Sequence, residues 1–291
     1  MTSNLRPSFI GLVRAEVRKI VLQRTTWLIL GAALLVFAVV ALGLSSASSF
    51  RHQLALDPTS WFEQMVEILY LTYATGAGIF LLIVGARMVS MEYASGTIRI
   101  VLARGVGRLQ LLSAKLVALA LIALVLLAAF TLLATAFLLA LVHTWTGSLS
   151  TLTALPALAR GEVWGVLEAA SVSMAVCILL ALAAGVVGRA PGFALGFALG
   201  LFPADNFGTI ILALLGRATG QTVWLQISQW LLGPNLNYLL HVLEPGIRIR
   251  IAFAAPLVAV DAHHVAAVIT VWALALLGTA VYLTWRRDVL E

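Results

Sequence analysis

The sequence predicts an all-α membrane protein with six transmembrane helices. Hydrophobic residues make up 62% of the 291 positions and charged residues only 10%, whereas a soluble domain carries roughly a quarter charged residues. Mean hydropathy is +1.05. Long uncharged runs recur along the chain, and about 20 apolar residues are enough to cross a bilayer. We therefore expect residues 1–291 to form a single membrane domain.

The first expected element is an amphipathic helix over residues 8–25. At 100° per residue its apolar side chains share one face, and Glu16, Lys19 and Gln23 lie opposite. Such a helix lies in the membrane interface, with its cations near lipid phosphates. It is either a simple anchor or the rim of a docking site. The apolar face comprises Phe9, Ile10, Val13, Val17, Ile20 and Val21, and the interfacial cations are Arg14, Arg18 and Lys19.

A secretory signal peptide is the alternative for residues 1–49, which have a basic start, an apolar stretch and small residues after it. The basic part is long, and the apolar stretch is long enough to stay in the membrane, so a first span is favoured.

Six apolar runs predict the spans. The third is too long for one bilayer, so its start is expected to project from the membrane. An even number of spans places both termini on one side. The expected spans are residues 27–44, 69–89, 109–142, 166–187, 193–215 and 264–285.

Basic residues predict the orientation, because Lys and Arg concentrate on the cytoplasmic side. The segments before 27, around 92–115 with Arg87 included, at Arg189 and after 285 hold 13 of the 18 Lys and Arg residues. Both termini and the 92–115 segment are therefore expected in the cytoplasm of a cell-membrane protein. No aromatic–basic interleaving suggests a nucleic-acid partner.

The segment Glu92–Lys115 is a polar strip between the second and third spans. It contains four cations, and Ser95-Gly96-Thr97 interrupts any helix running through it. Thr97 is expected to cap a new short helix and Gly105 to end it. The strip thus predicts a short cationic helix held against the membrane. Its cations are Arg99, Arg104, Arg108 and Lys115.

Residues 216–263 form the longest expected outer segment, between the fifth and sixth spans. Gln221–Leu232 and Asn235–Leu243 read as two short helices separated by Gly233 and Pro234. Both are too short to span, so we expect a lid that dips into the outer leaflet.

One acid, Asp205, falls in the middle of a predicted span, where an ionisable residue is costly unless paired or hydrated. With Pro203 and Asn206 it marks either a hydrated substrate path or hinge, or a site that pairs within the protein or lies near an interface. Earlier in the sequence, Gly192, Gly196 and Gly200 have the spacing of small residues at close helix contacts.

Catalytic and metal-binding patterns are weak. No phosphate-binding GxxxxGK[ST] motif is present, and the lysines are Lys19 and Lys115 alone. Glu162 and Glu168 suggest a solvated helix start rather than acid–base chemistry. Asp261 with His263 and His264 matches no strong metal signature. We expect no metal and no cofactor in this chain.

These features together resemble the ABC-2 permeases, the membrane subunits of type-2 ABC exporters. The motif that carries the resemblance is E-x3-G-T-x-R with a later Arg and Lys, and the six-span architecture extends over nearly the whole chain. The motif residues are Glu92, Gly96, Thr97, Arg99, Leu102, Gly105, Arg108 and Lys115.

The resemblance implies that Ile98–Ala103 is a coupling helix docking on a separate ATP-binding subunit, and that the N-terminal helix forms the other edge of the contact. Two ATPase copies would bind ATP and Mg, and a second permease, identical or homologous, would pack through spans one and five, with Gly192, Gly196 and Gly200 available for that contact. The cargo, moved outward, would be apolar or amphipathic: a lipid, peptide antibiotic or drug. The docking residues implied are Glu92, Gly96, Thr97, Ile98, Arg99, Leu102, Ala103 and Arg104.

Two other readings stay open from the residues alone. One is a channel or secondary transporter without an ATPase, although an ion-coupling chain of acids is not apparent in the spans. The other is an intramembrane enzyme or a structural membrane subunit of a larger complex, which the outer acids and histidines would support.

Overall fold

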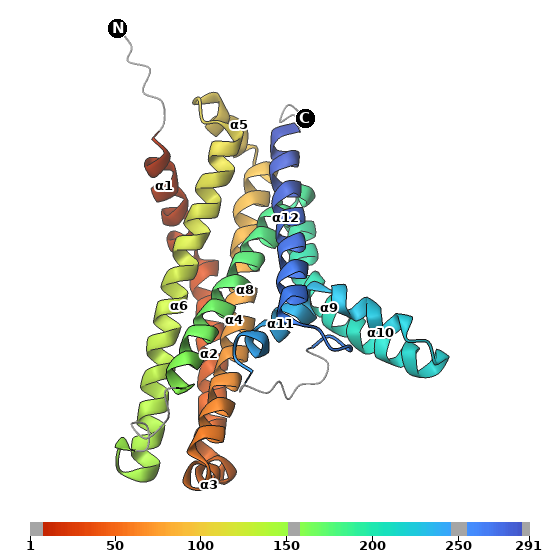
Figure 1. Ribbon diagram of the computed structural model, residues 1–291. Helices are drawn as coiled ribbons and strands as arrows, with labels where there is room; N and C mark the ends of the chain where they lie inside the picture. The colour runs from red at the N-terminus through yellow and green to blue at the C-terminus, as the bar shows by residue number, and fades with distance from the viewer. Residues whose placement is uncertain (1–7, 151–157, 246–254, 287–291) are drawn as a thin grey trace.

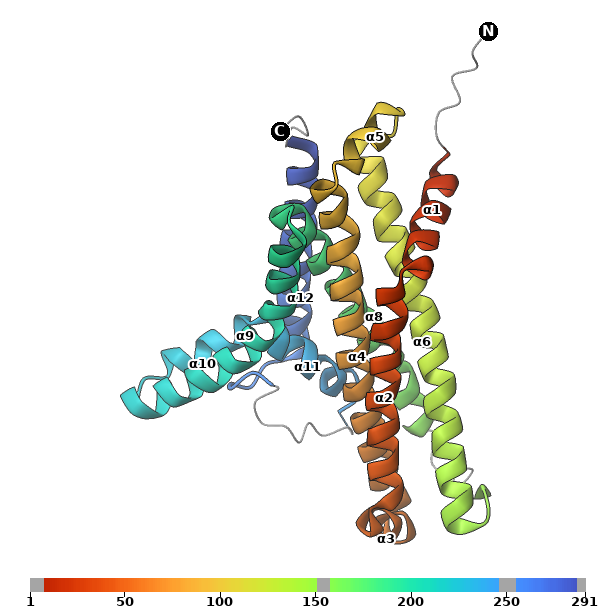
Figure 2. The ribbon, with the colours of Figure 1, turned by 180° about the vertical axis from the view of Figure 1, so that it is seen from behind.

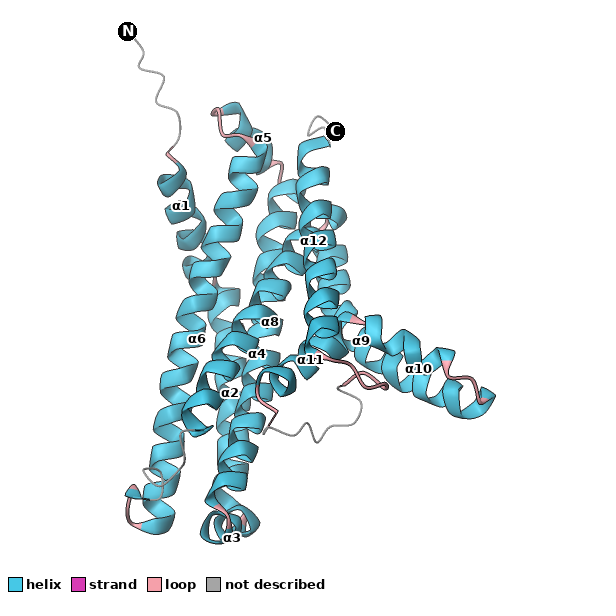
Figure 3. Cartoon of the chain, viewed as in Figure 1, coloured by secondary structure: helices cyan, strands magenta, loops and turns pink. Residues whose placement is uncertain are grey.

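The computed structural model describes residues 8–150, 158–245 and 255–286. These residues form helices joined by short turns, and no strand occurs among them (Figure 3). The long helices stand side by side as one bundle (Figure 1). They are α2 (Arg24–Ser46), α4 (Pro58–Ala94), α6 (Arg108–Thr146), α8 (Leu158–Gly188), α9 (Pro191–Thr219) and α12 (Ala262–Arg286).

Five of these helices are long and apolar enough to cross a membrane as continuous rods, and α9 makes a sixth if its two bent parts count as one span. Each predicted span is thus a helix, but most helices extend past the predicted ends. The helix α4 begins at Pro58, and its N-cap is Asp57, whose carboxylate accepts from the Ser60 backbone N–H at 3.1 Å. Caps of this kind let polar residues continue a helix beyond the bilayer.

The core of the bundle lies between α4 and α8. A Cβ built on Gly85 of α4 would lie 2.7 Å from the Cβ of Ala181, and one built on Gly185 of α8 would lie 2.6 Å from the Cβ of Val89. Glycine at these positions lets the two helix backbones approach closely. In contrast, only 6% of the span of α2 is buried, so α2 lies at the edge of the bundle.

The fifth predicted span, residues 193–215, is bent. Its two parts, Pro191–Leu201 and Pro203–Thr219, meet at 41°. Proline cannot donate the backbone hydrogen bond of a helix interior and so favours a kink. The second part leaves the bundle sideways, and a return segment runs back beside it (Figure 2). We call residues 203–230 the lateral arm.

The return segment consists of α10 (Val223–Ile227) and a 3₁₀ helix, η1 (Ser228–Trp230), followed by α11 (Leu232–Leu243). Two short helical pieces were expected here, but the break was expected at Gly233 and Pro234. It lies at Leu231, whose backbone is extended. Gly233 and Pro234 instead lie in the first turn of α11, where proline is tolerated because its missing N–H has no helical partner.

Three short elements complete the fold. The helix α1 (Phe9–Leu22) precedes α2 and lies along the start of α6. The helix α3 (Ser48–Leu56) joins α2 to α4 at one end of the bundle. The helix α5 (Thr97–Ala103) lies at the opposite end, together with the start of α1 and the end of α12 (Figure 1). We call this end the α5 end.

Candidate coupling site at the α5 end

The helix α5 is bounded by two glycines in the left-handed region. Gly96 has φ +67° and Gly105 has φ +82°, a conformation that costs other residues about 1–2 kcal/mol. The Gly105 N–H donates to Leu102 O at 2.9 Å, which confirms that Gly105 ends the helix. The prediction that Thr97 caps it is wrong, because Gly96 holds the N-cap position and Thr97 is the first helical residue. The Thr97 hydroxyl lies 3.0 Å from that of Ser95.

The two faces of α5 differ in burial. On the inner side Ile98 is 7% exposed and packs with Val106 and Leu111, while Leu102 lies half-buried against them. Ile98 and Leu102, two of the residues that the sequence suggested for docking, thus line the inner side of α5, and their docking role stays a prediction. The outer face of α5, as we use the term, consists of Arg99, Ile100, Ala103 and Arg104, all exposed.

Ile100 lies within the predicted coupling helix Ile98–Ala103 but was not singled out as a docking residue, and its side chain is 56% exposed. A large apolar side chain between two arginines on a short exposed helix suits a protein contact, because interface centres are apolar and their surroundings polar. The signal was available in the sequence, since Ile98 and Ile100 cannot both face inward on one helical turn.

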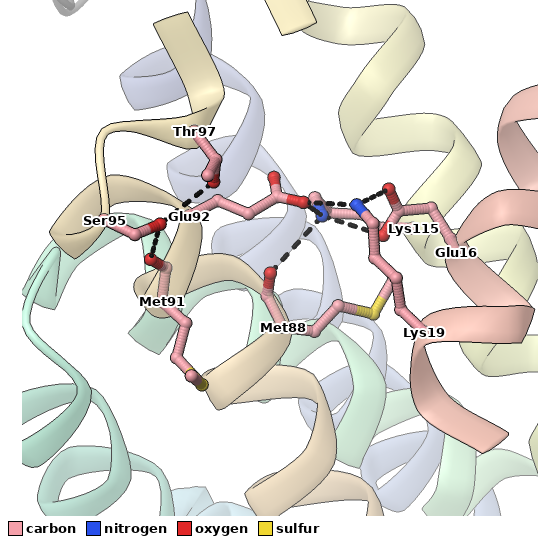
Figure 4. Close-up of polar contacts among 8 residues, drawn as sticks. All are labelled: Glu16, Lys19, Met88, Met91, Glu92, Ser95, Thr97 and Lys115. Carbon is pink, nitrogen blue, oxygen red and sulfur yellow. Dashed lines mark hydrogen bonds and ion pairs between the residues drawn. The ribbon is translucent and has the colours of Figure 1, made fainter. Parts of the chain in front are cut away.

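Behind α5, four charged side chains form a closed ring, the charge tetrad Glu16, Lys19, Glu92 and Lys115 (Figure 4). Lys19 Nζ lies 2.6 Å from Glu16 Oε1 and 2.7 Å from Glu92 Oε1. Lys115 Nζ lies 2.9 Å from Glu16 Oε2 and 2.9 Å from Glu92 Oε1. Charges of opposite sign alternate around the ring, and the ring joins α1, α4 and α6.

The tetrad is largely withdrawn from solvent. Glu16 is 2% exposed and Lys115 3%, whereas the Lys19 side chain is 45% exposed. Lys115 also donates to Met88 O at 3.3 Å, so its three acceptors match the three N–H donors of an ammonium group. Buried charges persist when they are paired and hydrogen-bonded in this way.

These contacts correct two predictions. Glu16 was placed opposite the apolar face of the N-terminal helix, yet it is buried together with Ile20 of that face, while Ile10 is 79% exposed. Glu92 was expected at the margin of a docking surface, but its carboxylate faces Lys19 and Lys115 inside the protein. Arg14 and Arg18 are exposed, and the interfacial position of α1 stays a prediction.

The environment of Lys19 favours its charged form. Partial burial by itself lowers the pKa of the ammonium group, but the hydrogen bonds and charges of Glu16 and Glu92 outweigh this, so the pKa of Lys19 is raised above 10.5. Lys19 therefore stays charged at neutral pH and holds the two carboxylates together.

A small cavity adjoins the tetrad on the side of α12. Glu92 and Thr284 both line it, and neither Glu92 Oε2 nor Thr284 Oγ1, both buried, has a hydrogen-bond partner. Its volume of about 20 Å³ is enough for one water. Arg108, also in the wall, donates to Trp285 O at 3.3 Å. The end of α12 is thus next to the tetrad.

The residues around the bend in α9 interact within the protein. Asp205 Oδ2 accepts from the Gly233 N–H at 3.0 Å, in the first turn of α11. Asn237 Nδ2 donates to Asn206 Oδ1 at 3.1 Å. Of the two readings of Asp205, internal pairing is the one these contacts support, since a carboxylate is favourable at a helix N-terminus. Pro203 lies at the bend and is exposed.

The glycines of α9 do not serve packing within the chain. A Cβ added to Gly192, Gly196 or Gly200 would meet nothing within 4 Å, and all three are exposed. Phe193 and Phe197 stack beside them with ring centroids 6.3 Å apart. This face of α9 is open, and its role in a permease contact stays a prediction.

The outer acids and histidines have structural contacts. Asp261 Oδ1 accepts from the His264 N–H at 2.8 Å at the start of α12, and His264 Nε2 lies 3.0 Å from Gln229 O. Within the described residues no group of three His, Cys, Asp or Glu could hold a metal ion. Glu168 is exposed, and the Glu162 side chain lies outside the described part.

The sequence profile of the ABC-2 family transporter proteins matches residues 12–202, which is more than half of the chain. The chain belongs to the ABC-2 family. It is therefore a multi-pass membrane permease of the ABC transporter class, whose members in general dimerise and partner with an ATP-binding subunit. A search of curated proteins gives no match. The matched residues include α5 and the whole tetrad, whereas α11 and α12 lie beyond them.

Proposed function

We propose that this ABC-2 permease is the membrane subunit of an exporter driven by ATP hydrolysis on two copies of a separate subunit, which dock at α5. The observation that carries the proposal is the outer face of α5. It presents Arg99, Ile100 and Arg104 at the end of the bundle, on a helix fixed between the ends of α4 and α6.

The chemistry of this face suits a protein groove. Ile100 provides an apolar anchor, and the two arginines provide charged hydrogen-bond donors for acidic residues on the rim of the groove. Because Ile98 is packed against Val106 and Leu111, the helix is held on its inner side and offers its outer side as a firm surface. Gly96 and Thr97 set the turn that starts it.

The helix α1 is the second edge of the proposed contact. Its Arg14 and Arg18 are exposed at the same end of the bundle as α5, where they can reach lipid phosphates or the partner. The excess of basic residues on this side supports a cytoplasmic location for it and for both termini of a cell-membrane protein. An ATPase that uses cytoplasmic ATP would then meet α5 directly.

The mechanism follows from this placement. ATP and Mg bind to the two ATPases and draw them together, the two α5 helices move with them, and α4 and α6 carry the movement into the membrane. Cargo leaves outward between two permease copies, identical or homologous, with the segment 216–263 as an outer lid. The open face of α9 with Gly192, Gly196 and Gly200, together with the little-buried α2, provides surface for the second copy.

The cargo class is apolar or amphipathic, such as a lipid, a peptide antibiotic or a drug. Large apolar side chains are exposed along α2 and α9, among them Leu34, Leu35 and Phe197. A path between two such surfaces would be predominantly apolar, and apolar walls favour apolar cargo.

Reversing the charge of the outer face tests the docking site. The double variant Arg99→Glu/Arg104→Glu is expected to lose a co-expressed ATPase subunit in a pull-down from membranes, since both changes repel an acidic rim. A matched control is Arg51→Glu/Arg217→Glu, at two exposed arginines outside the α5 end, which should bind the ATPase as the wild type does. A complex that survives the α5 double change intact would show that α5 is not the docking site.

A further inference from the structure

We propose that the charge tetrad is the joint through which movement of α5 reaches α1 and the first span, α2. This inference rests on the proposed docking of an ATPase at α5 and goes beyond it by naming the residues that connect the docking helix to a particular span.

The tetrad fixes three helices around α5. Glu92 lies near the end of α4, just before α5, and Lys115 lies in the second turn of α6, just after it. Glu16 and Lys19 belong to α1, which has no chain connection to α5 within 70 residues. Any displacement of α5 moves Glu92 and Lys115 first, because both are attached to it through the chain.

The ring transmits displacement because its contacts are short and directional. Apolar contacts such as those of Ile20 resist separation but allow sliding. Charge-assisted hydrogen bonds of 2.6–2.9 Å do not allow it, since they weaken once their geometry is lost. Each helix of the ring contributes to at least two contacts, so α1 cannot shift along α6 without breaking both Lys115–Glu16 and Lys19–Glu92.

The next step is the connection from α1 to α2. The helix is interrupted at Gln23, which lies between α1 and α2 and has an extended backbone. Two side chains span this break: Thr26 Oγ1 donates to Ile20 O at 2.7 Å, and Trp27 Nε1 donates to Val21 O at 2.8 Å. These bonds tie the start of α2 to the end of α1, so the two helices move together.

The helix α2 has few other contacts through which displacement at the α5 end could reach it. Only 6% of its span is buried, and within the described part of the chain its main neighbours are α4 and α1. Besides its flanks along α4 and along α6, where Phe37 packs against Phe130 and Phe137, α2 is linked to the α5 end through α1 and the tetrad.

The test removes α1 from the ring while leaving every remaining charge paired. In Glu16→Met/Lys19→Met, Glu92 and Lys115 keep their 2.9 Å contact. In Glu92→Met/Lys115→Met, Glu16 and Lys19 keep theirs at 2.6 Å. Both variants break the ionic contacts between α1 and the α4–α6 pair, from opposite sides, while the packing of Ile20 remains, so a folding defect in one leaves the other available. Lys19→Arg is the conservative control, which keeps the charge at a half-exposed position.

Movement is read by spin-label distances in the permease–ATPase complex in nanodiscs, without nucleotide and trapped with ATP and vanadate. The native cysteine, Cys177, is buried and does not interfere. One label pair joins Met91 of α4 to Leu274 of α12, and the other joins Leu28 of α2 to Leu274. All three positions are exposed.

In the wild type and in Lys19→Arg, ATP is expected to change both distances. In the two double variants the Met91–Leu274 change should persist, and the Leu28–Leu274 change should be much smaller than in the wild type. A Leu28–Leu274 change that equals the wild type in both double variants would overturn the joint and leave the docking site standing. Failure of the wild-type permease to bind the ATPase through α5 would refute the docking site and, with it, this inference.

Discussion

The Lys115 ammonium lies 2.9 Å from Glu16 Oε2, although 99 positions separate the two residues in the sequence. Both side chains are almost completely buried. Lys115 also meets Glu92, so one ammonium group on α6 neutralises carboxylates from two other helices. The stability of the α5 end therefore depends strongly on this single lysine.

Replacing Lys115 by methionine is expected to destabilise the protein by about 3–5 kcal/mol, because two buried carboxylates lose a charged partner. Lys19→Met should have a smaller effect, since Lys19 is 45% exposed and water can replace part of its interaction. Thermal unfolding of the detergent-purified permease measures both. Equal shifts in Tm for the two variants would contradict the dominant role of Lys115.

Gly85→Leu is expected to disrupt the α4–α8 core, because even a Cβ at this position would lie 2.7 Å from the Cβ of Ala181. Overpacking of this kind costs typically 1–3 kcal/mol and more where backbones must part. The matched control is Gly196→Leu, which has open space around it. Size-exclusion profiles should show a loss of folded protein for Gly85→Leu alone. Gly196→Leu should keep the fold, and any loss of dimer in that variant would support the α9 contact.

Asp205→Ala is expected to weaken the attachment of the lateral arm to α11, because the Gly233 N–H loses its acceptor. A lost capping acceptor costs about 0.5–2 kcal/mol. Hydrogen exchange should become faster in the first turn of α11. Asp205→Asn retains a carbonyl oxygen that can accept the same bond, so it should exchange more slowly than the alanine variant. Unchanged exchange in Asp205→Ala would mean that the carboxylate does not hold α11.

The spans could be predicted from the sequence, since each is a helix close to its apolar run. Their ends could not, because hydropathy stops at the first polar residues whereas a capped helix continues past them, as α4 does from Pro58. The bend at Pro203 was signalled by proline itself. The direction taken by the lateral arm depends on long-range contacts such as Asp205 with Gly233.

The site was predicted in part. Gly105 ends α5 as expected. Glu16 was placed opposite the apolar face, but at 100° per residue it lies only about 40° from Ile20, and the two side chains are buried together. The composition of the sequence nevertheless contained one indication of the tetrad. The two lysines of this arginine-rich chain, Lys19 and Lys115, both belong to it. Their pairing required the fold, because no local pattern relates α1 to α6.

The close contact of Gly85 with Ala181 divides α4 into a short part toward α5 and a long part toward Pro58. About 9 residues, or roughly 14 Å of helix, separate Gly85 from the end at Ala94, and about 27 residues, or roughly 40 Å, separate it from Pro58. A rigid helix that tilts about this contact would convert a shift of about 1 Å beside α5 into one of about 3 Å at the far end, in the opposite direction. A small displacement of α4 with a large force at the α5 end would then become a larger displacement with a smaller force at the far end of the helix.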